Sequence, residues 1–145
     1  MTKTIFRGLE KKIQDINIED AKRCFINKNL YNIWSTGDGG IEYYIDGKER
    51  YYLTIGLSTN TENEFMLEYK DNEADGYWCS VGNFNTLDEW QEFGNDFYAR
   101  RGTFLTPEET WLAVEDFLKT GQMSNKINWI NADDLPEEKY PNPAS

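Results

Sequence analysis

Histidine is absent from the 145 residues, and there are only two cysteines, Cys24 and Cys79. Without histidine the chain cannot form a Ser-His-Asp or Cys-His nucleophile pair, and the usual zinc and non-haem iron ligand sets are missing too. Two cysteines far apart in the sequence indicate buried free thiols rather than a disulfide framework. The sequence therefore predicts no histidine- or cysteine-based catalytic residue, no metal site and no cofactor, and leaves carboxylates as the remaining catalytic candidates.

Long apolar runs are also missing from the sequence. No stretch approaches the roughly 20 apolar residues that a membrane helix requires. The first residues lack the apolar segment and small-residue cleavage site of a secretory signal peptide. These absences predict a cytoplasmic protein with no membrane partner.

Basic residues are few: 15 Lys and Arg stand against 26 Asp and Glu, which gives a net charge of −11 and a pI near 4.4. Such a chain is repelled by nucleic acid and by anionic membranes, and its scattered basic residues predict no groove for a phosphate backbone. The acidity either serves solubility or is directed at a basic partner. In the second case, complementary charge can raise association rates to about 10⁸–10⁹ M⁻¹s⁻¹.

Three short segments suggest ligand sites but lack the residues that such sites need. Gly37-Asp38-Gly39-Gly40 has neither the Lys-Ser/Thr of a phosphate loop nor a following helix, and is interpreted as a tight turn. The loop 71–76 is half as long as a calcium loop and has no closing glutamate. Asp133-Asp134 is typical of a cap and a solvated turn. Chance pairs are certain among so many acids, so an acidic pair does not by itself indicate a glycosidase or magnesium site.

The best-defined element is a helix near the end of the chain. Thr106 is a good N-cap, Pro107 suits the first helical position, and Glu109 completes a capping box. Gly121 can adopt the left-handed conformation that ends the helix. A short loop and a strand at residues 127–130 follow.

The remaining sequence predicts strands joined by turns, with one further helix. Strands are expected at residues 12–18, 41–45, 50–57, 64–69, 77–81, 96–104 and 127–130, and helices at residues 17–26 and 106–121. Asp46-Gly47 is a hairpin signal, and the alternation over 64–69 turns Phe65, Leu67 and Tyr69 toward the core. Residues 1–10 carry little pattern, and residues 87–93 suggest either a helical turn or an irregular excursion.

These elements predict the α+β class, with a mostly antiparallel sheet, an N-terminal helix and a C-terminal helix packed on it, and a final strand that closes the fold. The length and the lack of linkers predict a single domain over residues 1–145, with a tail loosely ordered from about residue 136.

Several segments carry a resemblance to a known family. They are Leu53–Leu57, Tyr77–Gly82, a strand near Phe97-Tyr98, Phe104–Pro107, and the run Ala113–Gly121 (A-V-x-x-F-L-x-T-G) followed by Ile127-Asn128-Trp129. Together they resemble the deaminase-associated immunity family of bacterial polymorphic toxin and contact-dependent growth inhibition systems. The resemblance covers roughly residues 50–135. The usual proline after the helix is absent, and residues 122–125 stand in its place.

The resemblance implies a non-enzymatic antitoxin that binds a cognate toxin domain one-to-one in the cytoplasm. Toxins paired with this family resemble nucleic-acid deaminases or nucleases, whose basic clefts would suit an acidic inhibitor. We expect stoichiometric occlusion, in which acidic side chains meet substrate-binding Lys and Arg and aromatic side chains anchor the contact. The candidate toxin-binding residues are Glu64, Glu68, Asp71, Glu73, Asp75, Tyr77, Glu89, Trp90, Glu92 and Asp96. Each has an alternative role in an ordinary solvated loop or in the core.

Two other functions remain open at this point. An acidic nucleic-acid mimic that inhibits another nuclease would need carboxylates spaced like phosphates along one face. A small carboxylate-based enzyme or ligand-binding domain would need a concave pocket with two acids of raised pKa.

Overall fold

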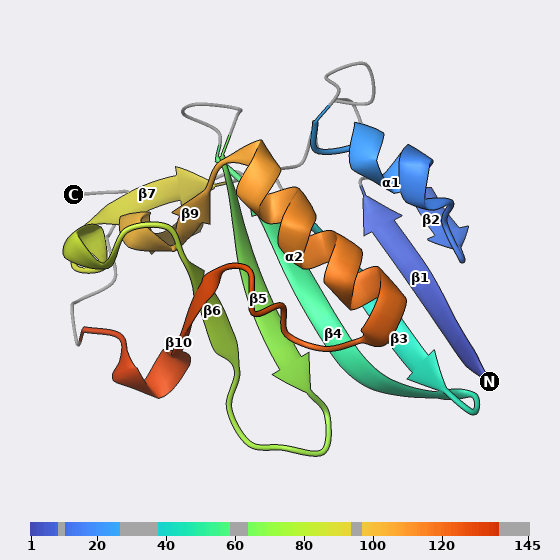
Figure 1. Ribbon diagram of the computed structural model, residues 1–145. Helices are drawn as coiled ribbons and strands as arrows, with labels where there is room; N and C mark the ends of the chain where they lie inside the picture. The colour runs from blue at the N-terminus through green and yellow to red at the C-terminus, as the bar shows by residue number, and fades with distance from the viewer. Residues whose placement is uncertain (9–10, 27–37, 59–63, 94–96, 137–145) are drawn as a thin grey trace.

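The computed structural model describes residues 1–8, 11–26, 38–58, 64–93 and 97–136 (Figure 1). Within them the chain forms a mostly antiparallel sheet with few helices, which confirms the predicted α+β class. The strands are β1 (Thr2–Gly8), β2 (Lys11–Gln14), β3 (Asp38–Ile45), β4 (Lys48–Leu57), β5 (Phe65–Asp71), β6 (Trp78–Val81), β7 (Trp90–Phe93), β8 (Phe97–Arg100), β9 (Phe104–Leu105) and β10 (Asn128–Asn131). The α-helices are α1 (Ile18–Arg23) and α2 (Pro107–Thr120), and the 3₁₀ turns are η2 (Phe84–Thr86), η3 (Arg101–Thr103) and η4 (Ala132–Asp134).

The main sheet runs in the order β10-β6-β5-β4-β3-β1-β2, and β9 pairs with β5 beyond the end of β6. The hairpin of β7 and β8 forms a separate two-stranded sheet. Both α-helices lie on one face of the main sheet, with α2 running along its middle strands (Figure 1). Among the described residues, no helix has the length and apolar character needed to cross a membrane.

The core lies between that face and α2. The side chains of Phe65, Leu67 and Tyr69 are buried there, as the alternation predicts. The Thr106 side chain accepts a bond from the Glu109 N–H, and the Glu109 side chain accepts one from the Thr106 N–H, so the capping box is present. Both cysteines are buried and free, as predicted.

A buried hydroxyl joins three segments where β5 changes partner. Strand β5 pairs with β6 at Glu68 and Tyr69 but with β9 at Phe65 and Met66. Between these pairings, the Leu67 N–H donates to the Ser80 Oγ at 3.0 Å, and the Ser80 hydroxyl donates to the Thr103 carbonyl at 2.7 Å. Ser80 therefore replaces a missing ladder bond with its side chain.

Two sequence expectations at the N-terminal half are wrong. Residues 2–8 form β1, which pairs along its whole length with β3, whereas the strand expected over residues 12–18 is limited to β2 because Ile18 already begins α1. The expected turn at Gly37–Gly40 is instead strand from Asp38 onward, and Gly37 lies outside the described residues. Gly40 serves close packing, since a Cβ there would overlap the Tyr52 ring.

The chain crosses itself closely at the end of β6. The N–H groups of Gly82 and Asn83 both donate to the Gly102 carbonyl, at 2.7 and 3.0 Å. A Cβ on Gly82 would overlap the carbonyl oxygen of Phe104, so only glycine fits at this crossing. The crossing fixes η3, and with it Arg100 at the end of β8, against the sheet.

Residues 87–104 are more extended than the sequence suggests. The segment expected as a helical turn or excursion contains β7, and the strand expected over 96–104 is divided into β8, η3 and β9. Ala99 of β8 packs on Met66 of β5, on the sheet face opposite the helices. The β7–β8 hairpin therefore covers one end of that second face.

Candidate functional site

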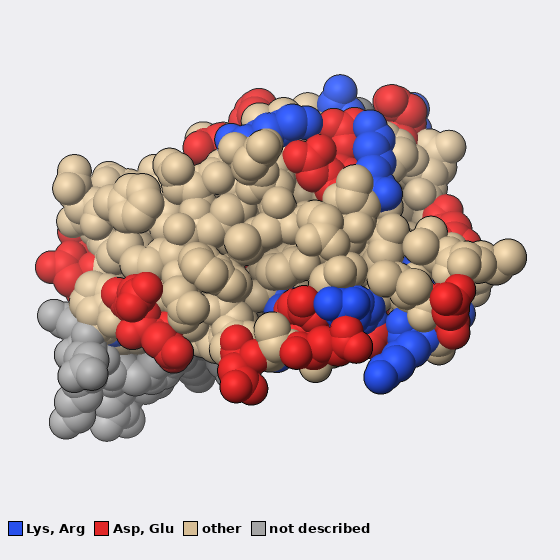
Figure 2. All heavy atoms as spheres, turned by 60° about the horizontal axis from the view of Figure 1, so that its bottom comes forward, with Lys and Arg blue, Asp and Glu red and all other residues tan. Residues whose placement is uncertain are grey.

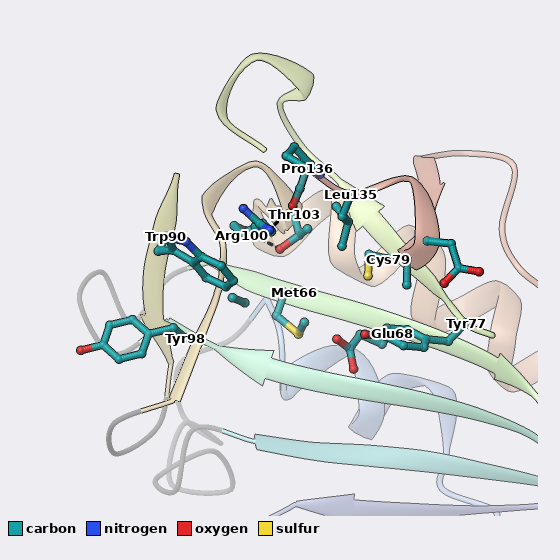
Figure 3. A pocket seen from close by; sticks show the side chains of 13 residues that line it. Met66, Glu68, Tyr77, Cys79, Trp90, Tyr98, Arg100, Thr103, Leu135 and Pro136 are labelled. Atoms are coloured by element: carbon teal, nitrogen blue, oxygen red, sulfur yellow. Dashed lines mark hydrogen bonds between the residues drawn. The ribbon is translucent and has the colours of Figure 1, made fainter. Parts of the chain in front are cut away.

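A cavity of about 400 Å³ lies beneath the β7–β8 hairpin (Figure 3). Strands β5 and β6 form its floor, β7 and β8 one wall, and the segment from η4 to Pro136 the other. Much of its lining is apolar, from Met66, Cys79, Ala99, Leu135 and Pro136. We call it the Arg100 cavity, after the only Lys or Arg of the described residues that lines it.

The Arg100 side chain is only 8% exposed. Its guanidinium carbon lies 4.1 Å from the centre of the Trp90 ring, an attractive cation–π geometry, and its Nη2 donates to the Pro136 carbonyl. Its buried Nη1 has no hydrogen-bond partner among the described residues, and none of their carboxylates forms an ion pair with it. A buried cation is thus held by an aromatic face and one carbonyl.

Glu68 lines the same cavity from β5, directly opposite Cys79 of β6. Burial raises the pKa of the Glu68 carboxyl, and within the described chain that carboxyl takes part in no ion pair. Burial, assisted by the negative charge of Glu68, raises the pKa of the Cys79 thiol to about 12. The thiol is therefore inert at neutral pH.

The acids of the β5–β6 loop do not form one free cluster. Arg50 binds Asp71 through Nε at 2.9 Å and Glu73 through Nη1 at 2.8 Å. The bond from Arg50 is the main reason that the pKa of Asp71 lies below its usual value. Asp75 is exposed and has no ion pair with any described residue. Of the three predicted loop acids, only Asp75 offers uncompensated charge.

The other predicted residues are dispersed. Glu64 accepts a bond from the Gln91 amide at 3.4 Å, and Glu89 lies 4.0 Å from Arg101. The Trp90 ring packs against Arg100 rather than projecting as an anchor. The Glu92 side chain and Asp96 lie outside the part of the chain that is described. The structure therefore brings Glu68, Tyr77 and Trp90 together in the Arg100 cavity, whose lining does not include Glu64, Asp71, Glu73, Asp75 or Glu89.

A second surface combines aromatic and acidic side chains at the rim of the sheet. Tyr77 is 41% exposed and Trp78 is 38% exposed. The Ala132 N–H donates to the Tyr77 carbonyl at 2.9 Å, which places η4 and its exposed acids Asp133 and Asp134 beside them. Together with Asp75, these residues form what we call the Tyr77 rim. Figure 2 shows a largely uncharged face of the molecule, with Asp and Glu side chains along its edges beside Lys and Arg side chains.

Sequence reasoning missed four of these functional candidates: Trp78, Arg100, Asp133 and Asp134. One available signal was the pair Tyr77-Trp78, because neighbouring residues of a strand point to opposite faces and both cannot enter one core. The acids at 133–134 were interpreted as a cap, but the cap of η4 is Asn131, whose side chain accepts from the Asp133 N–H.

No group of three or more His, Cys, Asp or Glu side chains in the described residues could hold a metal ion. Two acids line the Arg100 cavity, Glu68 and Asp133, and burial raises the pKa of Glu68. A comparison of the chain with protein-family models finds no match, and neither does a comparison with curated protein sequences.

Proposed function

We propose that the chain is an immunity protein that binds a basic, nucleic-acid-targeting toxin domain one-to-one and blocks it without catalysis. The observation that carries the proposal is the Tyr77 rim, where two exposed aromatic side chains stand among three carboxylates. None of these carboxylates has an ion pair with a described residue.

Aromatic side chains and uncompensated charge contribute differently to such a contact. Tyrosine and tryptophan bury much area at little entropic cost and dominate interface energies. Carboxylates chiefly steer a basic partner and speed its approach. The pKa of Tyr77 is raised by partial burial, and further by the negative charges of Glu68 and Asp133, so the aromatic anchor lies in a negative field.

The proposal includes the arrangement predicted from the order of elements in the sequence, with N- and C-terminal helices on the sheet and a final strand that closes it. It also includes a cytoplasmic location, and no direct binding to nucleic acid or membrane. The strong net negative charge supports both exclusions.

The structure favours this function over a nucleic-acid mimic. A mimic needs a row of free carboxylates spaced like phosphates. Arg50 neutralises both Asp71 and Glu73, which interrupts the acids of the β5–β6 loop. The remaining acids of the rim come from two separate segments, the loop and η4.

The test is co-expression with the toxin domain encoded immediately upstream, followed by affinity measurement and a growth assay. Tyr77→Ala and Trp78→Ala are measured separately, because the two side chains face opposite sides of the rim. We expect at least one of them to weaken binding by roughly 30-fold, the size of a hot spot of about 2 kcal/mol. A complete absence of complex and of growth protection would refute the proposal.

A charge variant separates steering from anchoring. Asp75→Asn combined with Asp133→Asn should slow association more at about 150 mM than at about 500 mM salt, because salt screens exposed charges. Glu19→Gln combined with Glu108→Gln is the matched control, since it removes the same charge from exposed positions on the helices. Equal effects of the two double variants would show that net charge, and not the Tyr77 rim, guides the partner.

A further inference from the structure

Three charged side chains line the Arg100 cavity: Arg100, Glu68 and the exposed Asp133. Arg100 lies on the hairpin side and Glu68 on the floor (Figure 3). Neither forms an ion pair with a described residue. Burying a charge without a partner is costly, so the persistence of both in one cavity requires an explanation.

Arg100 and Glu68 lie apart in the cavity (Figure 3), and among the described residues no ion pair joins Glu68 to Arg100 or to Lys70 of the same strand. The Lys70 ammonium instead donates to the Ala74 carbonyl in the β5–β6 loop. Figure 3 shows Met66 between Arg100 and Glu68, so apolar lining separates these two charged groups.

We propose that the Arg100 cavity binds a small zwitterion, with its carboxylate at Arg100, its ammonium at Glu68 and a short apolar chain between them. The apolar chain would lie along Met66, Cys79 and Leu135. The volume of about 400 Å³ is within the usual range of small-molecule sites. The Arg100 guanidinium lies over the Trp90 ring, and its buried Nη1 has hydrogens left to donate to a carboxylate.

A ligand with one charge would match the cavity less well. A simple anion would leave Glu68 uncompensated and would approach against the net charge of −11. A simple cation would pair with Glu68 and Asp133 but would leave the buried Nη1 of Arg100 without a partner. A zwitterion supplies a partner to Arg100 and to Glu68 at once, so only this class removes both penalties.

The test uses the full chain and three probes of equal length: 6-aminohexanoate, hexanoate and hexylamine. Each is titrated into the protein by calorimetry and by NMR of the cavity residues. We expect 6-aminohexanoate to bind at least about tenfold more tightly than either singly charged probe. Equal binding of hexanoate, equal binding of hexylamine, or no binding of any probe overturns the proposal.

Two variants test which residue binds each charged end of the ligand. Glu68→Gln should weaken the binding of 6-aminohexanoate and should not weaken the binding of hexanoate. Arg100→Gln should weaken the binding of 6-aminohexanoate and should not weaken the binding of hexylamine. Glu49→Gln, on β4 and outside the cavity lining, is the matched control. If Arg100→Gln fails to fold, the near-isosteric Glu68→Gln and the three probes decide the matter, and an unchanged affinity in Glu68→Gln refutes the assignment.

Discussion

The Ser80 hydroxyl gives a sharp test of how the sheet is held where β5 changes partner. Its Oγ accepts from the Leu67 N–H and donates to the Thr103 carbonyl, and the residue is fully buried. Ser80→Ala removes one oxygen atom and leaves a buried donor and a buried acceptor without a partner. We expect this substitution to lower the free energy of unfolding far more than its small volume suggests.

The magnitude follows from the two groups that lose their partner. Each unsatisfied buried group costs about 1–3 kcal/mol, so the pair costs about 2–6 kcal/mol before relaxation. A small backbone shift recovers part of this, and we expect a net loss of about 3 kcal/mol. Against a typical total of about 5–15 kcal/mol, such a loss is large.

The assay is urea unfolding, monitored by the fluorescence of the five tryptophans. The loss of unfolding free energy is calculated from the shift in the urea midpoint, provided that the dependence of that free energy on urea concentration is unchanged. Thr120→Val is the matched control, because the exposed Thr120 hydroxyl also donates once, to the Asp116 carbonyl, and accepts once, from the Gln122 N–H. Water can replace both hydrogen bonds of Thr120, so Thr120→Val should lower the free energy of unfolding by less than about 1 kcal/mol. If Ser80→Ala lowers the free energy of unfolding no more than Thr120→Val does, the hydrogen bonds of the Ser80 hydroxyl do not stabilise the sheet.

Three further outcomes are expected. Thr106→Ala should lose about 0.5–2 kcal/mol by removing the capping box, with Glu109→Gln as the milder control in the same unfolding assay. Arg50 depresses the folded pKa of Asp71, so the stabilisation from this pair is present above the unfolded value of about 3.9 and is lost as pH falls through the folded value. The difference in urea midpoint between wild type and Asp71→Asn should therefore narrow in acid, and a constant difference would contradict this. Cys79, with a pKa of about 12, should react with a thiol reagent near neutral pH only after unfolding, and fast labelling of the folded protein would contradict its burial.

Elements marked by local chemistry could be predicted from the sequence. The α2 capping box depends on residues within one turn, and the β3–β4 turn at Asp46-Gly47 depends on two adjacent residues. Strand β1 could not be predicted in this way. Thr4, Ile5 and Phe6 are buried in succession, so the strand lacks the alternation of a half-exposed edge, and its conformation depends on pairing with the distant β3.

The candidate sites were harder to predict, because their residues come from distant segments. Glu68 was predicted from the outward face of its strand, and Tyr77 from its place beside an acidic loop. Arg100 gave no signal, because its position depends on a hairpin and a chain crossing that bring β8 against β5. Asp133 becomes a neighbour of Tyr77 only through the backbone bond of Ala132.

The close approaches at Gly40 and Gly82 limit substitution at these two positions in different ways. At Gly40 the obstacle is the Tyr52 side chain, so a larger residue could be accepted after a smaller one replaces the tyrosine, and the two positions should change together. At Gly82 the obstacle is the main-chain oxygen of Phe104, which no substitution can remove. Among relatives, Gly82 should therefore persist even where Tyr77 and its acidic neighbours have changed with a different partner.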